Sequence, residues 1–136
     1  MSEQPQFTVQ MALPFAAAVA RTREALKAEG FGILTEIDLA AAFREKLGHE
    51  FRPYVILGAC NPPLAYAAVS ADPSVGLLLP CNVTVEAAGP EQAVVRLTDP
   101  EALLGGRGVS EELRQVAADA RARLVRVRAV LAGAAA

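Results

Sequence analysis

Glycine and proline divide this chain into short segments, and their positions constrain the fold more than any other feature of the sequence. Residues 7–11 alternate between apolar and polar side chains, which is typical of a strand. Pro14 suits the first turn of a helix, and Gly30 suits the left-handed cap that ends one. Between them, four residues recur at helical spacing: Phe15, Val19, Thr22 and Leu26. The pattern predicts a strand followed by a helix.

A second strand and helix follow directly. Residues 31–37 are rich in β-branched and aromatic side chains. A strict two-residue period would place four of them on one face, which we expect to pack against helices: Phe31, Ile33, Thr35 and Ile37. Asp38 is placed to cap the next helix, and Gly48 to close it.

The run at residues 53–59 is almost entirely apolar and has the length of a strand. Such a run favours a strand that is covered on both sides or lies centrally in its sheet. Asn61 then fits the N-cap of a helix, with Pro62 and Pro63 in its first turn.

The last third of the chain predicts a hairpin and a long helix. Residues 82–87 and 93–98 alternate like paired strands, and Gly89 with Pro90 supplies the turn between them. The C-terminal helix is expected over residues 110–131, with one apolar stripe: Leu113, Val116, Ala117, Ala120, Leu124, Val127 and Leu131.

Taken in order, the segments predict an α+β fold in a single domain spanning residues 1–136. We expect a two-layer sandwich in which about five strands form a mixed sheet and about four helices lie on one face. A chain of 136 residues is large enough to bury a core without disulfides or metals.

Composition narrows the classes of partner. Thirteen basic residues against fifteen acidic ones give no general attraction to nucleic acid. We expect a cytoplasmic protein that does not enter the membrane, because no apolar run approaches the length of a membrane span. The hydrophobic fraction of 53% is high for a small domain and favours a homodimer that covers apolar surface.

The two cysteines and the two asparagines of the chain form two identical dipeptides, Cys60-Asn61 and Cys81-Asn82. Each dipeptide closes an apolar run, so we expect two similar corners that meet in the fold. Together with Pro62, these four residues are the candidate ligand-binding site, for a small polar molecule. The alternative interpretation is structural: small cysteines fill space, and asparagine side chains cap turns.

Thiol chemistry is a second hypothesis for the same residues. Cys60 precedes a helix N-terminus, which favours the thiolate, so it is a candidate nucleophile with Cys81 as resolving thiol. His49, the sole histidine, is a candidate base. No metal site is predicted, because two cysteines twenty-one residues apart are not a close ligand pair. The sequence specifies no cofactor.

Two strings carry a family resemblance: residues 58–65, Gly-Ala-Cys-Asn-Pro-Pro-Leu-Ala, and residues 78–83, Leu-Leu-Pro-Cys-Asn-Val. With the segments around Gly30 and Asp38, they resemble the domain of unknown function family DUF302 over roughly residues 7–104. The resemblance implies a compact α/β domain that forms homodimers, and it implies no biochemical activity. Three functions therefore stay open: a small-molecule-binding domain, a thiol enzyme or redox protein, and an interaction module without a ligand.

Overall fold

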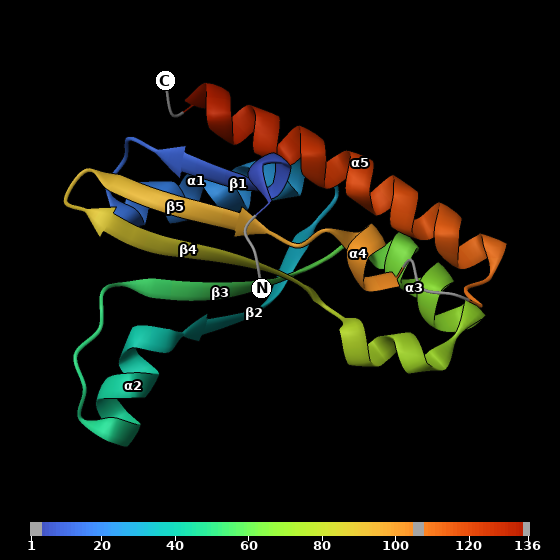
Figure 1. Ribbon diagram of the computed structural model, residues 1–136, viewed down its shortest axis with the longest axis horizontal. Helices are drawn as coiled ribbons and strands as arrows, with labels where there is room; N and C mark the ends of the chain where they lie inside the picture. The colour runs from blue at the N-terminus through green and yellow to red at the C-terminus, as the bar shows by residue number, and fades with distance from the viewer. Residues whose placement is uncertain (1–3, 105–107, 135–136) are drawn as a thin grey trace.

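The computed structural model describes residues 4–104 and 108–134. Five strands form one sheet in the order β1-β5-β4-β3-β2, shown in Figure 1. Their bounds are β1 Thr8–Met11, β2 Gly32–Asp38, β3 Tyr54–Cys60, β4 Cys81–Gly89 and β5 Gln92–Leu97.

Every neighbouring pair of strands in this sheet is antiparallel, so the prediction of a mixed sheet is wrong. The cause is the path of the chain after β1. The helix that follows carries the chain across the sheet, and β2 pairs at the opposite edge instead of beside β1. Strands β1 and β2, which α1 joins, are therefore not neighbours. The strands that α2 and α3 join are neighbours, but each pair is antiparallel.

The predicted order of strands and helices is confirmed. The described part of the chain also contains three short helices that were not predicted: one α-helix after β5 and two 3-10 helices. The helices are η1 Pro5–Phe7, α1 Phe15–Ala28, α2 Leu39–Leu47, α3 Pro62–Ala71, η2 Pro73–Leu78, α4 Pro100–Leu104 and α5 Glu111–Ala134. Among the described residues, no helix is both long and apolar enough to span a membrane.

The core lies between one face of the sheet and helices α1 and α5, which Figure 1 shows on the same side. From the strands it takes Val55, Leu57, Val83, Val85 and Val95, all at most 6% exposed. The predicted stripe of α5 is confirmed, because all of its members are buried or half-buried. On the opposite face, several alternate strand residues are half-buried or exposed, among them Tyr54, Ile56 and Asn82, and the part of the chain that the structure describes packs neither α1 nor α5 there.

Arginines of α5 fasten this helix to the sheet and to α1. Arg128 donates from Nε to the carbonyl oxygen of Thr8 in β1, at 3.2 Å. Arg123 donates from Nη1 to the carbonyl oxygen of Glu29, just beyond the end of α1, at 2.9 Å. One backbone carbonyl of the edge strand β1 is thereby bonded to a side chain of α5.

Strand β2 does not present the face predicted for it. Ile33 and Thr35 pair with consecutive residues of β3, so Leu34 is an extra residue that forms a bulge. The bulge reverses the alternation. Phe31 and Ile33 therefore face the helices, while Thr35 and Ile37 face the uncovered side, where Ile37 is 48% exposed.

Strand β3 lies inside the sheet, but second from its edge, and β4 occupies the centre. Only its alternate residues Val55, Leu57 and Ala59 pack beneath the helices. Tyr54 and Ile56 lie half-buried on the uncovered face. The continuous apolar run therefore reflects an interior strand with one covered face, and not a strand sandwiched between layers.

Candidate functional site

The two Cys-Asn dipeptides do meet in the fold. Strand β3 ends at Cys60 and β4 begins at Cys81, and the antiparallel register pairs Ala59 with Cys81 and Gly58 with Asn82. The corner therefore lies where β3 ends and β4 begins. Residues about twenty positions apart in the sequence are neighbours across these two strands.

Asn61 is a structural residue in this corner. Its side-chain oxygen accepts a hydrogen bond from the backbone N–H of Leu64 at 3.2 Å, which caps α3 as predicted. Its amide nitrogen lies 3.5 Å from the carbonyl oxygen of Glu29, which also accepts from Arg123. Asn61 is only 7% exposed, and it joins the end of α1 to the start of α3.

Glycine is required opposite Asn61. Gly30 has a φ of +86°, and a Cβ atom there would lie 2.8 Å from the Asn61 amide nitrogen. Gly58 is still more confined, since a Cβ would lie 2.2 Å from Thr35 Oγ1 and 2.8 Å from Pro80 Cγ. The corner therefore has no room for a side chain at either glycine. The Leu79–Pro80 peptide bond within the corner is cis.

Asn82 has a different environment. It is exposed on the uncovered face of the sheet, and its backbone carbonyl accepts a hydrogen bond from Thr98 Oγ1 at 2.5 Å. One asparagine is thus buried at a helix cap and the other lies at the surface. The identical dipeptides do not form two equivalent sites.

The space left in the corner is small and apolar. Its cavity measures about 40 Å³, and apart from the Cys-Asn residues its walls come from side chains such as Phe31, Leu64, Leu104 and Val116. A water molecule needs roughly 10–15 Å³ by this kind of measure. The cavity is therefore large enough for a few waters and too small for an organic ligand.

The thiols are close in the register, and both line the corner cavity. Cys81 lies directly opposite Ala59, the residue before Cys60. Burial raises the pKa of the Cys60 thiol. Burial, followed by the proximity of Cys60, also raises the pKa of Cys81. Both effects oppose formation of a thiolate at neutral pH.

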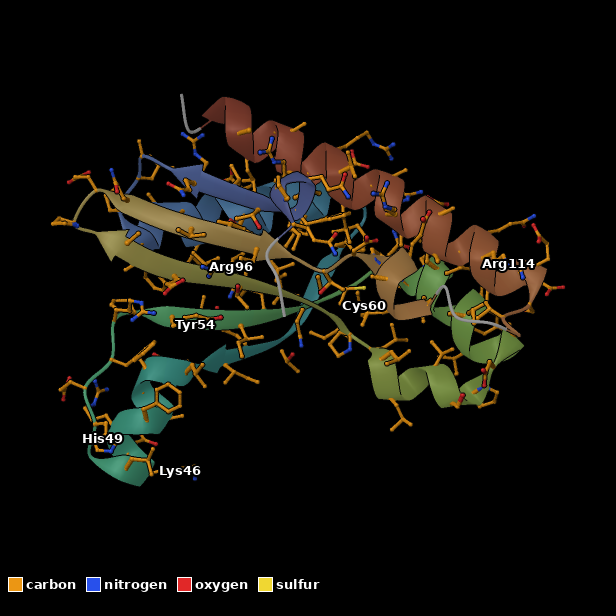
Figure 2. The ribbon with its side chains drawn as sticks, in the orientation of Figure 1. Lys46, His49, Tyr54, Cys60, Arg96 and Arg114 are labelled. Carbon is orange, nitrogen blue, oxygen red and sulfur yellow. The ribbon has the colours of Figure 1, made fainter. Side chains whose placement is uncertain are left out.

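His49 lies far from both thiols. It is exposed in the loop between α2 and β3, at the end of β3 opposite to Cys60, as Figure 2 shows. The seven residues of β3 separate the two, a span of roughly 20 Å at about 3.3 Å per residue. The structure does not bring the candidate base to the candidate nucleophile. Among residues 4–104 and 108–134, no three metal-ligating side chains are grouped to hold an ion.

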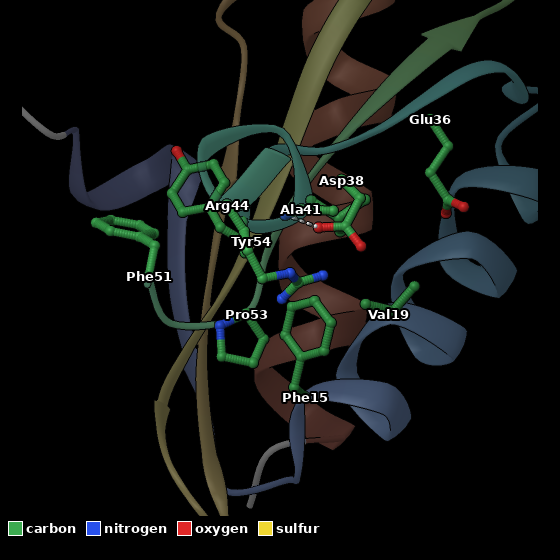
Figure 3. A pocket seen from close by; sticks show the side chains of 11 residues that line it. Phe15, Val19, Glu36, Asp38, Ala41, Arg44, Phe51, Pro53 and Tyr54 are labelled. Atoms are coloured by element: carbon green, nitrogen blue, oxygen red, sulfur yellow. Dashed lines mark hydrogen bonds between the residues drawn. The ribbon is translucent and has the colours of Figure 1, made fainter. Parts of the chain in front are cut away.

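A larger cavity, which we term the α1–α2 cleft, opens between α1, α2 and the start of β3 (Figure 3). It measures about 330 Å³. Its apolar wall consists of Phe15 and Val19 of α1, Phe51 and Pro53 of the loop, and Tyr54 of β3. Phe51 packs edge-on against Phe43 of α2, with ring centroids 5.3 Å apart.

Three charged residues border the same cleft. Glu36 forms an ion pair with Arg23 of α1. Asp38 caps α2 by accepting from the Ala41 N–H at 2.9 Å, as predicted. Figure 3 shows the Arg44 guanidinium directed into the cleft, between Phe15 and Asp38 in that view. The Arg44 side chain forms no hydrogen bond or ion pair with the described residues.

Sequence reasoning missed this cleft. The one available signal was the cap residue Asp38, because Arg44 lies six residues further along the same short helix. Nothing in the sequence indicates that Phe15, forty residues from Tyr54, forms the opposite wall.

A second charged group lies on the uncovered face. Glu86 of β4 is only 8% exposed, and it accepts from Arg96 Nη1 at 2.6 Å and from Arg52 Nε. Burial by itself would raise the pKa of Glu86, but hydrogen bonds from Arg96 and Arg52, together with their charges, hold it below its ordinary value. Glu86 therefore remains ionised at neutral pH.

These observations define the protein as a small α+β domain whose antiparallel sheet carries helices on one face and a charged cleft at one end. A family model described as "Domain of unknown function DUF302" matches residues 7–131. The chain therefore belongs to the DUF302 family, and the match extends beyond the expected residues 7–104 to include most of α5.

A solved structure supports the same assignment. It is the crystal structure of an uncharacterised conserved DUF302 protein from Bacillus stearothermophilus, which is 30% identical in sequence. The alignment covers 92% of this chain and 96% of that chain, with a TM-score of 0.80. A comparison with curated proteins gives no match.

Proposed function

We propose that this protein is a small-molecule-binding domain, and that its ligand occupies the α1–α2 cleft instead of the Cys-Asn corner. The observation that carries the proposal is the combination of volume and wall chemistry. The cleft measures about 330 Å³, against about 40 Å³ at the corner. Natural ligand sites measure roughly 300–1,000 Å³ and combine apolar walls with a few convergent polar groups.

The charges around the cleft suit a small zwitterion, such as a free amino acid. The Arg44 guanidinium supplies donors for a carboxylate. Asp38 keeps one carboxylate oxygen that has no partner among the described residues, and this oxygen suits an ammonium group. Phe15 and Tyr54 form the apolar wall for a side chain.

The test is a titration with free amino acids, followed by calorimetry. N-acetyl derivatives lack the ammonium group and amino acid amides lack the carboxylate, so both are expected to bind more weakly. Arg44→Gln should weaken binding about ten-fold or more, since it removes a charge-assisted hydrogen bond.

The matched control is Arg114→Gln on α5. Arg114 is also exposed, and its ion pair with Glu111 has an N···O distance of 3.4 Å, remote from the cleft. Equal affinity of all three proteins for the amino acids would refute the site, as would binding of none of the compounds.

The proposal includes a homodimer formed through β2. Strand β1 is in contact with α5, whereas β2 is an edge strand that exposes Leu34 by 67% and Ile37 by 48%. Exposed apolar residues on an open edge are typical of interaction surfaces. A second copy of the chain is the partner that would cover both residues by two-fold symmetry.

Sedimentation analysis tests this interface. Leu34→Lys combined with Ile37→Lys should convert a dimer to a monomer, while Val130→Lys on α5, whose residue is 58% exposed, should leave it unchanged. A monomeric wild-type protein at all concentrations would refute the homodimer without affecting the cleft.

Thiol chemistry receives no comparable support. Burial raises the pKa of both cysteines, which disfavours the thiolate that a nucleophile needs. We therefore assign the Cys-Asn residues to the scaffold and the binding role to the cleft.

A further inference from the structure

The charged group around Glu86 borders a second hollow, separate from the α1–α2 cleft. This hollow, which we term the Arg52 hollow, measures about 740 Å³ and lies beside the β4–β5 turn. Phe15 and Pro53 stand between the two cavities, because they line both. The charged residues of the Arg52 hollow are Arg52, Glu86 and Arg96.

Two arginines, Arg52 and Arg96, share the Glu86 carboxylate here. Both guanidiniums donate to Glu86, one to each carboxylate oxygen. The carboxylate is nearly buried, with its side chain 11% exposed, whereas the Arg52 side chain is 53% exposed. Arg52 is therefore the accessible charge of the pair, and the Glu86 carboxylate is largely covered.

Arg52 is held in a fixed orientation from two directions. Its Nε donates to Glu86, and its guanidinium carbon lies 4.3 Å from the ring centroid of Phe51. Neither contact uses the two terminal nitrogens. These nitrogens form no hydrogen bond with the described residues, and together they present the planar fork that suits a carboxylate or phosphate.

The rest of the hollow is largely apolar. Its walls include Pro53 and Pro90 from the loops, Ala87 and Val94 from the hairpin, and Phe15 from α1. A free inorganic ion would leave these walls unused. An anion that carries an apolar group would cover them and place its charge at Arg52.

We infer that the Arg52 hollow is a second binding site, for an organic oxyanion with an apolar body, in which Arg52 receives the charge and Glu86 positions Arg52. The oxyanion is a carboxylate or a phosphate monoester, since the planar fork of arginine accepts either. The inference does not depend on a ligand in the α1–α2 cleft.

The experiment is a titration of the purified protein with octanoate and, separately, with octyl phosphate. Octanol and octylamine serve as the neutral and cationic counterparts. We expect saturable binding of at least one of the two anions, about ten-fold or more tighter than that of octanol. Binding of all four compounds with equal affinity would overturn the inference, because it would indicate nonspecific apolar association.

Variants then test the two assigned roles. Arg52→Gln should weaken binding of the anion about ten-fold and leave that of octanol unchanged, and Arg52→Lys should recover only part of the loss. Arg114→Gln on α5 is the control and should bind like the wild type. A wild-type affinity of the Arg52→Gln protein would overturn the site.

Glu86→Gln separates positioning from simple attraction. The substitution raises the charge of the group by one unit but weakens the contact that orients Arg52. If Glu86 positions the Arg52 guanidinium, the Glu86→Gln protein should bind the anion more weakly than the wild type. If only the net positive charge attracts the anion, this protein should bind it more tightly, and that result would overturn the role of Glu86. Arg44→Gln should not alter octanoate affinity, so failure of this site and failure of the α1–α2 cleft are distinguishable.

Discussion

The Cys-Asn corner and helix α2 lie at opposite ends of strand β3, and they differ in the contacts that their polar groups make. At the corner, Asn61 is 7% exposed and its side chain meets two backbone partners. In α2 none of the residues is buried, and the Arg44 side chain has no hydrogen-bond or ion-pair partner among the described residues.

The comparison shows that an unusual sequence motif can lie where packing is tight. The corner joins α1, α3 and two strands, so its residues hold these elements together. The groups that remain able to bind a ligand lie where packing is loose and where no motif is apparent. The predictions below test this contrast, from the largest expected effect to the smallest.

Substitution of Gly58 should produce the largest loss of stability. Gly58→Ala would place a methyl group 2.2 Å from Thr35 Oγ1, so the strands must shift. We expect the free energy of unfolding to fall by about 2–3 kcal/mol, the upper range for overpacking. Gly32→Ala, with nothing within 4 Å of its Cβ, is the control and should change stability by less than ~0.5 kcal/mol. Denaturant titration measures both, and equal stability of the two variants would contradict a packed corner.

The two asparagines should differ in the same assay. Asn61→Ala removes a helix cap and leaves a buried backbone N–H without its partner, at a cost of about 1–2 kcal/mol. Asn82→Ala removes an exposed side chain, and we expect a change within ~0.5 kcal/mol. Similar losses in both variants would restore the view that the dipeptides are equivalent corners.

Glu86 should give the uncovered face an acid-dependent stability. Its pKa in the folded protein lies below the ordinary value of 4.5. The stabilisation is therefore complete above about pH 4.5 and is lost as the pH falls through the folded pKa. Unfolding measured from pH 7 to pH 2.5 should show a steeper loss in the wild type than in Glu86→Gln. Parallel curves would indicate that the two arginines do not stabilise the carboxylate.

The smallest effect concerns the thiols. Because the pKa of Cys60 and that of Cys81 are raised above 9.0, alkylation of the native protein at pH 7 should be slower than in denaturant. Site-resolved mass spectrometry across pH 6–10 provides the measurement. A native thiol that titrates well below 9.0 would return thiol chemistry to consideration.

Much of the fold could be predicted from local patterns, and the reasons are physical. Asp38, Gly48 and Asn61 were predicted correctly as caps because capping depends on a few adjacent residues. The face of β2 was predicted wrongly, since the bulge at Leu34 arises from pairing with β3 and leaves no local signature.

The candidate site was predictable only in part. The meeting of Cys60-Asn61 with Cys81-Asn82 was expected and is confirmed by the register of β3 and β4. The ligand role given to these residues remains without support, because burial and packing depend on helices from elsewhere in the chain. Neither the α1–α2 cleft nor the Arg52 hollow could be located, since each is formed by segments far apart in the sequence.

The sequence by itself determined which segments form strands and helices, where they end, and that one apolar stripe of α5 is buried. These features follow from side-chain periodicity and from the backbone preferences of glycine, proline and capping residues. Only the tertiary structure decided that the sheet is wholly antiparallel and that its edges are β1 and β2. The tertiary structure alone also decided which polar groups are buried and hydrogen-bonded within the protein. Strand order and side-chain burial depend on contacts between distant segments, and no local pattern encodes them.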